Sequence, residues 1–313
     1  MQKQLKKRLF VVDSGKSCLE KILKEMNVAF CFYKNPEHIL TEAREFKPDL
    51  ILGDFGGMNQ EDLVSQFRNN SFLSNIPIIL CAGKTEITSI IRKINGNVND
   101  YLVKPYNQEE VSARIERVLR RHEEVLNSNP LSHLPGNIAI KKRIMHLSSL
   151  KEEFAVIYLD LDNFKAYNDY YGYFKGDEVI RFVADLCHVE ALQADDHAED
   201  TFVGHIGGDD FVLIRPVSHM ESFCGKLIQK FDEKITGFYS KRDRERGYIM
   251  SRDRKGMLKK FPLMSLTLAV VVNEKGSALH YGEISARGSE IKHYLKSFRG
   301  SHYLIDRRKK AAA

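Results

Sequence analysis

The chain has 313 residues, of which 43% are hydrophobic and 29% charged, and its formal net charge is +6 at pH 7. This length and composition fit two globular domains and exclude a disordered or fibrous chain. No apolar run approaches the roughly 20 residues of a membrane-spanning helix. The apolar block that follows the basic start, Leu9–Val12, is too short for the core of a signal peptide. We therefore expect a cytoplasmic protein without a membrane partner.

The five cysteines are scattered along the chain and include no CxxC pair. An odd number of isolated cysteines favours neither a disulfide framework nor a zinc site.

Short apolar segments alternate with amphipathic segments in the first half of the chain. The apolar segments predict buried strands, and the amphipathic ones predict helices. We expect strands at Leu9–Val12, Val28–Phe32, Leu50–Leu52, Ile76–Cys81 and Asp100–Val103, and helices at Leu19–Met26, Ile39–Phe46 and Glu86–Ile94. This alternation predicts an α/β domain with a doubly wound, five-stranded parallel sheet, whose functional residues lie at the carboxyl ends of the strands.

A longer helical pattern follows over Gln108–Leu126. Its apolar positions form one stripe: Val111, Ile115, Val118, Leu119, His122, Val125 and Leu126. The first part of this stripe is expected to pack on the first domain. The part beyond Arg120 is expected to leave that domain, where a coiled coil between two subunits would cover it. Pro130 disfavours a helical residue before it and ends the segment.

The second half mixes strands and helices in a different order. We expect strands at Phe154–Leu159, Phe202–Ile206, Phe211–Arg215 and Leu263–Val272, and helices at Asp177–Leu186, Glu221–Tyr239 and Ser285–Phe298. The polar and basic segment Ser240–Lys260 is expected to be an exposed excursion. The pattern predicts a second α/β domain.

Three acids of the second half stand at strand ends. Asp160 closes an apolar strand shortly before Lys165, and Gly207-Gly208-Asp209-Asp210 joins two strands. Glycines permit a tight turn and a close approach to a ligand, while carboxylates supply the hard oxygen ligands that Mg²⁺ prefers. Either motif alone is most often an ordinary turn. Together, three acids on neighbouring strands are the arrangement expected for metal-assisted nucleotidyl transfer.

The combined motifs resemble the signatures of GGDEF domains. Asp160–Asp177 is similar to the family's DxDxFKxxND segment, Gly207–Phe211 to its signature loop in a GGDDF version, and Leu131–Asn137 to its opening motif. The resemblance implies a GGDEF, nucleotidyl-cyclase-like fold. It also implies diguanylate cyclase activity, in which two GTP molecules form cyclic di-GMP and pyrophosphate. The expected assembly is an antiparallel homodimer with one GTP per subunit, and Mg²⁺ or Mn²⁺ is the expected cofactor.

The resemblance also assigns roles by position. Metal ligands would be the side chains of Asp160, Asp209 and Asp210 and the carbonyl of Leu161. Asp209 and Asp210 would be catalytic, with Asp209 assisting deprotonation of the 3′-hydroxyl. The GTP-binding set would comprise Asn163, Phe164, Lys165, Gly208 and Lys296 at the phosphates, with Asn168 and Asp177 at the guanine edge. A carboxylate that accepts hydrogen bonds from guanine would reject adenine, so we expect GTP rather than mixed purine use.

Three positions depart from this family pattern. Asp210 replaces the usual Glu and is one methylene shorter. The inhibitory RxxD motif is replaced by Ala198–Thr201, so product inhibition at that site is not expected. The usual tail KxxGRN is replaced by Lys296–Ser301, in which Lys296 is expected to meet phosphate and Arg299 is the nearest substitute for the arginine.

The first half resembles a response-regulator receiver over about residues 5–123. Asp54, at a strand end, matches the phosphoacceptor, Lys104 the phosphate-pairing lysine and Tyr101 the aromatic switch position; a cis peptide is expected before Pro105. The usual pair of acids is reduced to Asp13 followed by Ser14, and Cys81 replaces the usual Thr or Ser. Two hypotheses therefore stay open: phosphorylation of Asp54 by a sensor histidine kinase, or a receiver that serves only as a dimerisation scaffold.

The expected organisation is a receiver domain at 5–123, a connector helix and linker at 108–130, and a GGDEF domain at 131–308. The leading hypothesis is a diguanylate cyclase regulated by a partly degenerate receiver. The alternative is a catalytically weak GGDEF-type module that binds GTP or cyclic di-GMP and signals through a partner. A DNA-binding regulator is not favoured, because no basic helix-turn-helix module follows the receiver. We therefore expect no DNA partner.

Overall fold

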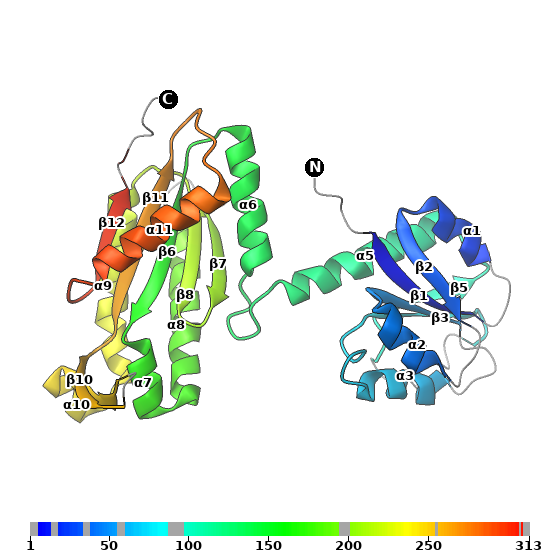
Figure 1. Cartoon of the computed structure of the whole chain (residues 1–313), viewed down its shortest axis with the longest axis horizontal. Helices are drawn as coiled ribbons and strands as arrows, with labels where there is room; N and C mark the ends of the chain where they lie inside the picture. The colour runs from blue at the N-terminus through cyan, green and yellow to red at the C-terminus, as the bar shows by residue number, and fades with distance from the viewer. Residues whose placement is uncertain are drawn as a thin grey trace. The chain divides into compact units, whose positions relative to one another are not determined.

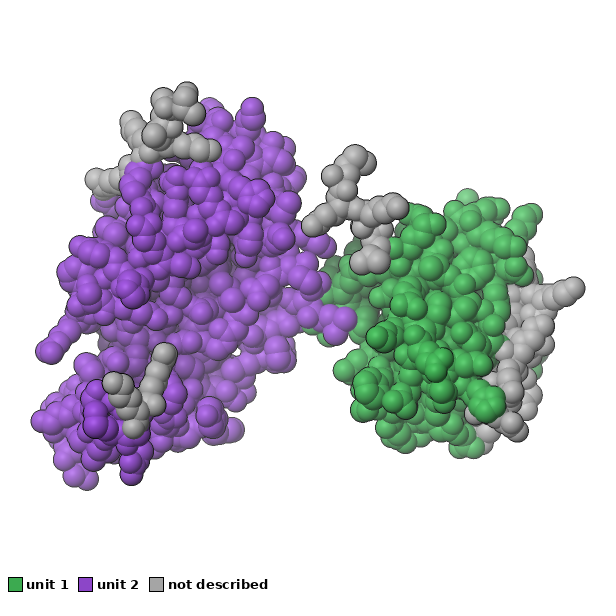
Figure 2. Space-filling model, in the orientation of Figure 1, with its two compact units in different colours: residues 1–125 green, residues 126–313 purple. Residues whose placement is uncertain are grey.

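A computed structural model of the chain describes residues 6–13, 18–33, 38–54, 60–86, 97–193, 201–253, 256–306 and 308. The chain divides into two units, Met1–Val125 and Leu126–Ala313 (Figures 1 and 2). Among the helices that the described residues form, none combines the length and hydropathy needed to cross a bilayer.

The first unit is built on a five-stranded parallel sheet in the order β2-β1-β3-β4-β5. Its strands are β1 (Lys7–Asp13), β2 (Val28–Tyr33), β3 (Leu50–Asp54), β4 (Ile78–Gly83) and β5 (Asp100–Lys104), and its helices are α1 (Cys18–Glu25), α2 (Ile39–Phe46), α3 (Gln60–Asn69) and α5 (Gln108–Leu126). Every residue of β3 is buried, as expected for a strand covered on both faces. The predicted fold of this half is confirmed, but most of the predicted helix Glu86–Ile94 lies outside the described residues.

Helix α5 has the predicted bounds and a divided apolar stripe. Val111, Ile115, Val118 and Leu119 are buried in the first unit. Val125 and Leu126, near the end of the helix, are 64% and 63% exposed. The proposed coiled coil between subunits stays a prediction.

The second unit is built on a five-stranded mixed sheet in the order β12-β11-β6-β8-β7. Its strands are β6 (Phe154–Asp162), β7 (Phe202–Gly207), β8 (Asp210–Arg215), β11 (Ser265–Asn273) and β12 (His302–Asp306). Only β11 and β12 pair in parallel; the other neighbours are antiparallel. The predicted mixed α/β fold is confirmed.

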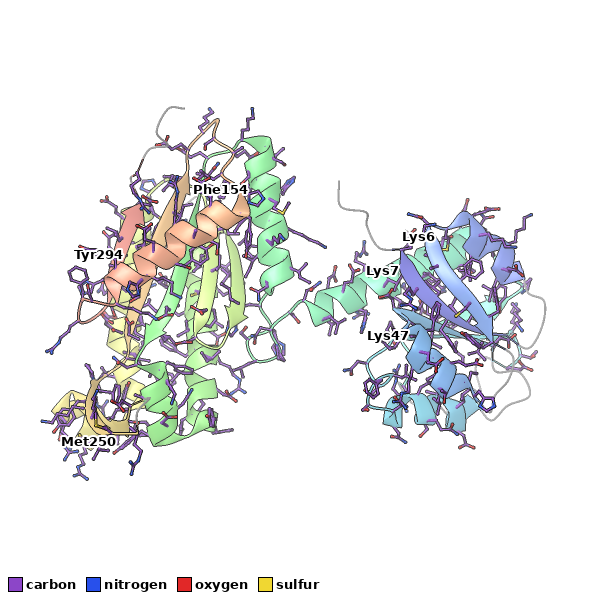
Figure 3. All side chains as sticks on the ribbon, viewed as in Figure 1. Lys6, Lys7, Lys47, Phe154, Met250 and Tyr294 are labelled. Atoms are coloured by element: carbon purple, nitrogen blue, oxygen red, sulfur yellow. The ribbon has the colours of Figure 1, made fainter. Side chains whose placement is uncertain are left out.

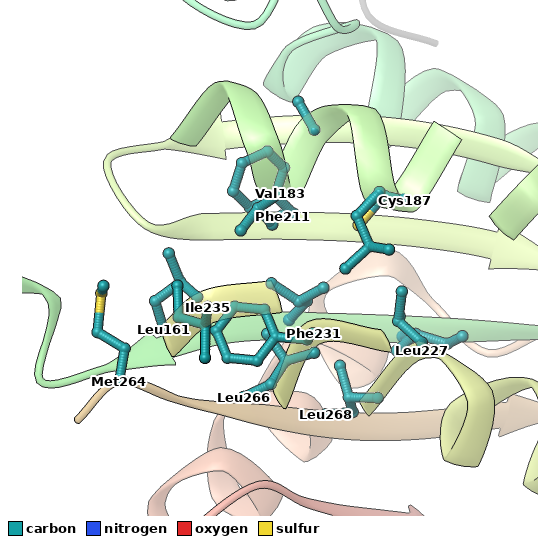
Figure 4. Close-up of a cluster of buried hydrophobic side chains, with 14 of the residues drawn as sticks. Leu161, Val183, Cys187, Phe211, Leu227, Phe231, Ile235, Met264, Leu266 and Leu268 are labelled. Atoms are coloured by element: carbon teal, nitrogen blue, oxygen red, sulfur yellow. The ribbon is translucent and has the colours of Figure 1, made fainter. Parts of the chain in front are cut away.

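Side chains of β6 alternate between the two faces of this sheet. The odd-numbered residues from Ala155 to Leu161 join the core beneath α8 (Tyr173–Gln193) and α9 (Met220–Ile235), part of which Figure 4 shows. The even-numbered residues from Phe154 to Tyr158 pack with α6 (Asn137–Leu150) and α11 (Tyr281–Leu295). Asp160 continues the even-numbered series and so faces α11.

The segment expected to be an exposed excursion, Ser240–Lys260, is largely exposed and forms a small folded element that was not predicted. Residues 240–262, here called the hairpin segment, contain α10 (Lys241–Arg246) and the antiparallel strands β9 (Tyr248–Arg252) and β10 (Leu258–Pro262) (Figures 1 and 3). The polar sequence of the segment agrees with the exposure of β10, most of whose residues are exposed. It is nevertheless attached through Asp243, which is 3% exposed and accepts a 2.6 Å hydrogen bond from Tyr171 in α7 (Phe164–Tyr171).

Candidate functional site

The three candidate acids meet at one end of the β6–β8 pair. Asp160 and Asp210 lie directly opposite each other in the strand register, and Asp209 lies in the turn between β7 and β8. Gly207 and Gly208 in this turn have φ values of 146° and 60°, in the region that favours glycine. A Cβ on either glycine would meet nothing within 4 Å, so the backbone here is open to a ligand.

Two lysines of α11 and its C-cap neutralise the buried acid of this group. The Nζ atom of Lys292 lies 2.9 Å from Asp160 Oδ1 and also contacts Asp210 Oδ1. The Nζ atom of Lys296 lies 3.0 Å from Asp160 Oδ2. The two lysines are four residues apart and therefore share one helix face. Lys296 was predicted at the phosphates; Lys292 was not predicted, although its spacing from Lys296 was a usable signal.

The pKa values of Asp160 and Asp209 are shifted in opposite directions. Burial disfavours the ionised form of Asp160, but Lys292 and Lys296 outweigh it and hold the pKa of Asp160 below its ordinary value. Burial, followed by the negative charge of Asp160, raises the pKa of Asp209. A carboxylate with a raised pKa is a stronger proton acceptor when ionised, which is suitable for a general base.

Asp162 has a structural role at the end of β6. Its Oδ2 atom accepts hydrogen bonds from Ser265 Oγ at 3.1 Å and Thr267 Oγ1 at 2.7 Å. Burial raises its pKa despite these two bonds. The contacts hold the β6 terminus against β11 and thereby fix the position of Asp160 two residues earlier.

The oxygen donors at this end of the sheet have the chemistry for a hard divalent cation. Asp160, Asp209 and Asp210 supply carboxylates, and the Leu161 carbonyl is adjacent in sequence. Within the described ranges, however, no three His, Cys, Asp or Glu side chains are already arranged to hold a metal ion. Lys292 instead contacts two of the three acids. The donor set fits Mg²⁺ or Mn²⁺, and Lys292 is the internal cation with which such an ion would share these carboxylates.

A cavity of about 500 Å³ adjoins the acids at the turn between β6 and α7. The predicted site residues that line it are Leu161, Asn163, Phe164, Lys165, Asp209 and Lys296. Arg252 of β9 and Arg299 after α11 also line it, and Arg252 was not predicted. The predicted residues Asp160, Asn168, Asp177, Gly208 and Asp210 are not among its lining residues.

The predicted guanine-edge residues lie on two consecutive helices. Asn168 is in α7, and Asp177, which is half-buried, is in the first turns of α8. Asn168 Oδ1 is buried and has no hydrogen-bond partner among the described residues. A Cβ built on Gly176 would lie 1.7 Å from this atom. The bare backbone of Gly176 therefore leaves the space that the Asn168 amide occupies.

Two of the predicted receiver residues, Asp54 and Lys104, meet at the carboxyl ends of their strands. Asp54, 5% exposed at the end of β3, forms an ion pair with Lys104 at the end of β5. Asp13 is the register partner of Asp54 in β1, and Cys81 is buried in β4. Tyr101 is 37% exposed, and the guanidinium of Arg114 lies 5.4 Å from its ring centroid. The predicted cis peptide between Lys104 and Pro105 is confirmed.

Comparison with known families identifies both halves of the chain. Residues 12–116 match the response regulator receiver domain, and residues 127–248 match the family described as diguanylate cyclase, GGDEF domain. The chain therefore carries a receiver domain followed by a GGDEF domain. The second match ends at Tyr248, the first residue of β9. Strands β11 and β12, which complete the five-stranded sheet of the second unit, lie beyond this match.

Individual relatives match parts of the chain. The DNA-binding response regulator MtrA of Mycolicibacterium smegmatis is 30% identical over 125 residues, which are 38% of this chain and 54% of the relative. The chain thus spans about half the length of that protein. A diguanylate cyclase of Vibrio cholerae is 37% identical over 87 residues, which are 27% of this chain and 25% of the relative.

Among solved structures, the GGDEF domain of TpbB (YfiN) from Pseudomonas aeruginosa is 18% identical, with a TM-score of 0.41. The similarity covers 57% of this chain and 93% of that one. The coiled coil and GGDEF domain of DgcB from Caulobacter crescentus, solved with c-di-GMP, is 17% identical, with a TM-score of 0.44. The similarity to DgcB covers 63% of this chain and 96% of the DgcB chain.

The contact at Gly176 gives a first prediction. Alanine is favoured over glycine inside a helix by about 0.5–1 kcal/mol, but at position 176 its methyl group must displace the Asn168 amide. We expect Gly176→Ala to keep α8 folded and to rotate Asn168, seen in a crystal structure or as a shifted side-chain amide resonance. Gly225→Ala is the matched control, because a Cβ there meets nothing within 4 Å. An unmoved Asn168 in Gly176→Ala would refute this account of the glycine.

Proposed function

We propose that the chain is a diguanylate cyclase that condenses two GTP molecules to cyclic di-GMP and releases pyrophosphate. The observation that carries the proposal is the meeting of Asp160, Asp209 and Asp210 beside a cavity lined by the β6–α7 turn and Lys296. The match to the GGDEF family supports it. The proposed domains are a receiver at 5–123, a connector at 108–130 and a GGDEF domain at 131–308.

The side chains of the site divide the chemical work. Asp160, Asp209, Asp210 and the Leu161 carbonyl would hold Mg²⁺ or Mn²⁺, which supplies charge stabilisation to the reacting phosphate. Asp209, which lines the cavity, accepts the proton of the 3′-hydroxyl. Asn163, Phe164, Lys165, Gly208 and Lys296 hold the phosphates. Asn168 and Asp177 select guanine, and so favour GTP over ATP.

Each subunit supplies only half of the reaction centre. A 3′-hydroxyl on one GTP must reach the α-phosphate of the other, so two GTP-loaded GGDEF domains have to face each other in a homodimer. Correct placement of the two substrates is itself a large part of the rate gain in such reactions.

A second candidate function is a weak module that binds GTP or cyclic di-GMP and acts through a partner. Two observations favour it: Asp210 is shorter than the usual Glu, and Lys292 already contacts Asp160 and Asp210. In this case the cavity binds nucleotide, but the acids contribute little to turnover.

Incubation of the purified full chain with GTP and Mg²⁺ separates the two functions. We expect cyclic di-GMP by mass spectrometry, and we expect Asp209→Ala to lower its formation by about 10² to 10⁴, the usual contribution of a general base, while the circular dichroism spectrum is unchanged. Bound GTP without product at high protein concentration would instead identify the binding module. Full turnover by Asp209→Ala would exclude Asp209 as the base.

We also propose that a sensor histidine kinase phosphorylates Asp54 and that receiver pairing brings the cyclase domains together. The buried Asp54 carboxylate and the Lys104 ammonium form the pair expected to receive a phosphoryl group. Loss of the usual second acid beside Asp13 weakens Mg²⁺ binding, so phosphoryl transfer to Asp54 is expected to be slow.

Beryllofluoride, which imitates an aspartyl phosphate, tests this regulation in the same assay. We expect it to increase both the dimer fraction and cyclic di-GMP formation of the wild type. Asp54→Asn should keep the basal rate and lose the response. An identical response in the two proteins would show that Asp54 is not the acceptor, and no response in either would leave the receiver as a scaffold.

A further inference from the structure

We propose that Arg252, on strand β9 of the hairpin segment, binds the terminal phosphates of GTP. This inference rests on the proposed nucleotide site and adds to it a residue from outside the GGDEF motifs. Arg252 lines the cavity of about 500 Å³ that Asn163, Lys165 and Lys296 also line. It also lines an adjoining hollow of about 670 Å³ with Lys165 and Asp169.

The acids around Arg252 are engaged with other groups. Asp162 accepts hydrogen bonds from Ser265 and Thr267, Asp169 pairs with Lys165 at 2.5 Å, and Asp253 pairs with Lys259 at 2.7 Å. The Nη1 atom of Arg252 donates a 2.8 Å hydrogen bond to the Gly256 carbonyl. In the described parts of the chain, no acid forms an ion pair with Arg252. Arg252 therefore lines a nucleotide-sized cavity without an ion pair among the described residues, although Asp162, Asp169, Asp209 and Asp253 line the same cavity.

An arginine in this position is suited to a polyphosphate. The guanidinium is planar and always charged, and it offers paired N–H donors that match two phosphate oxygens. The hydrogen bond from Nη1 to Gly256 restricts the side chain to the hairpin, so less rotational freedom is lost on binding.

The hairpin segment is attached to the same helix that carries Lys165. Asp243 Oδ2 accepts hydrogen bonds from Tyr171 at 2.6 Å and from Ser240 Oγ at 2.7 Å. Tyr167, also in α7, donates a 2.9 Å hydrogen bond to the Phe238 carbonyl just before the segment. Arg252 and Lys165 are thus held on segments that are hydrogen-bonded to each other, and both line the hollow of about 670 Å³.

The proposal predicts selective weakening of GTP binding. Binding of GTP, GDP and GMP to the full chain is measured by calorimetry with Ca²⁺ in place of Mg²⁺ to suppress turnover. Loss of one charge-assisted contact is expected to weaken GTP binding by roughly tenfold or more, with GMP binding unchanged. Arg252→Gln tests this, and Arg252→Lys should recover part of the loss. Arg244→Gln, an exposed arginine of the same segment, is the matched control and should bind GTP as the wild type does.

The outcomes separate this inference from the proposed activity. Wild-type GTP affinity in Arg252→Gln, or an equal loss for GTP and GMP, would overturn the role of Arg252. A selective loss for GTP in a protein that forms no cyclic di-GMP would keep the role of Arg252 and reject the cyclase. Absence of GTP binding by the wild type would overturn both.

Discussion

The carboxylates of Asp160 and Asp210 lie opposite each other on neighbouring strands, and the second unit needs a nearby cation to offset their repulsion. Like charges directly opposite each other on neighbouring strands repel, and burial of Asp160 adds the cost of removing a charge from water. Lys292 contacts both acids and so offsets the repulsion. Because the side-chain period of β6 is two, Asp160 shares a face with Tyr158 and α11 has to pack on that face. The helix therefore has two tasks: it completes the core and supplies the neutralising cation.

The same geometry links the acids to the nucleotide cavity. Lys296, one turn after Lys292, contacts Asp160 and also lines the cavity. Asp209 lines the cavity as well, with a pKa raised by burial and by the charge of Asp160. The hairpin segment is fixed to α7 through Asp243 and contributes Arg252 to the cavity lining. The proposed site thus combines oxygen ligands on the sheet with a neighbouring cavity that Lys165, Arg252 and Lys296 line.

Much of the fold could be predicted because buried strands and amphipathic helices have distinct periodicities. The five parallel strands and the bounds of α5 followed from such patterns. Helix α3 was missed because it is largely polar and its buried apolar residues are few: Leu63, Val64 and Phe67. Strand β12 was missed because it is short and partly exposed. The hairpin segment is largely exposed, as expected, but its strands and its attachment were not predicted, because the attachment depends on one buried acid, Asp243, amid many exposed charges.

The residues of the candidate site could likewise be predicted from the sequence only in part. Asp160, Asp209 and Asp210 could be placed together from sequence because strand ends converge. Lys292 and Arg252 were not predicted, because each reaches the site through tertiary packing, of α11 on β6 and of β9 on α7. For Lys292, the four-residue spacing from Lys296 was the one signal available in the sequence.

The central claim, that Lys292 neutralises the opposed acids of a cation site, is tested most directly by Lys292→Met. Thermal unfolding is measured with and without Mg²⁺, with Lys296→Met, which removes only one contact to Asp160, as the milder comparison. Without Mg²⁺ we expect Lys292→Met to lose about 1–3 kcal/mol of stability, since Asp210 then loses its lysine contact and Asp160 keeps only Lys296. Added Mg²⁺ should stabilise this variant more than the wild type. Equal stability of both proteins, with the same response to Mg²⁺, would contradict the account.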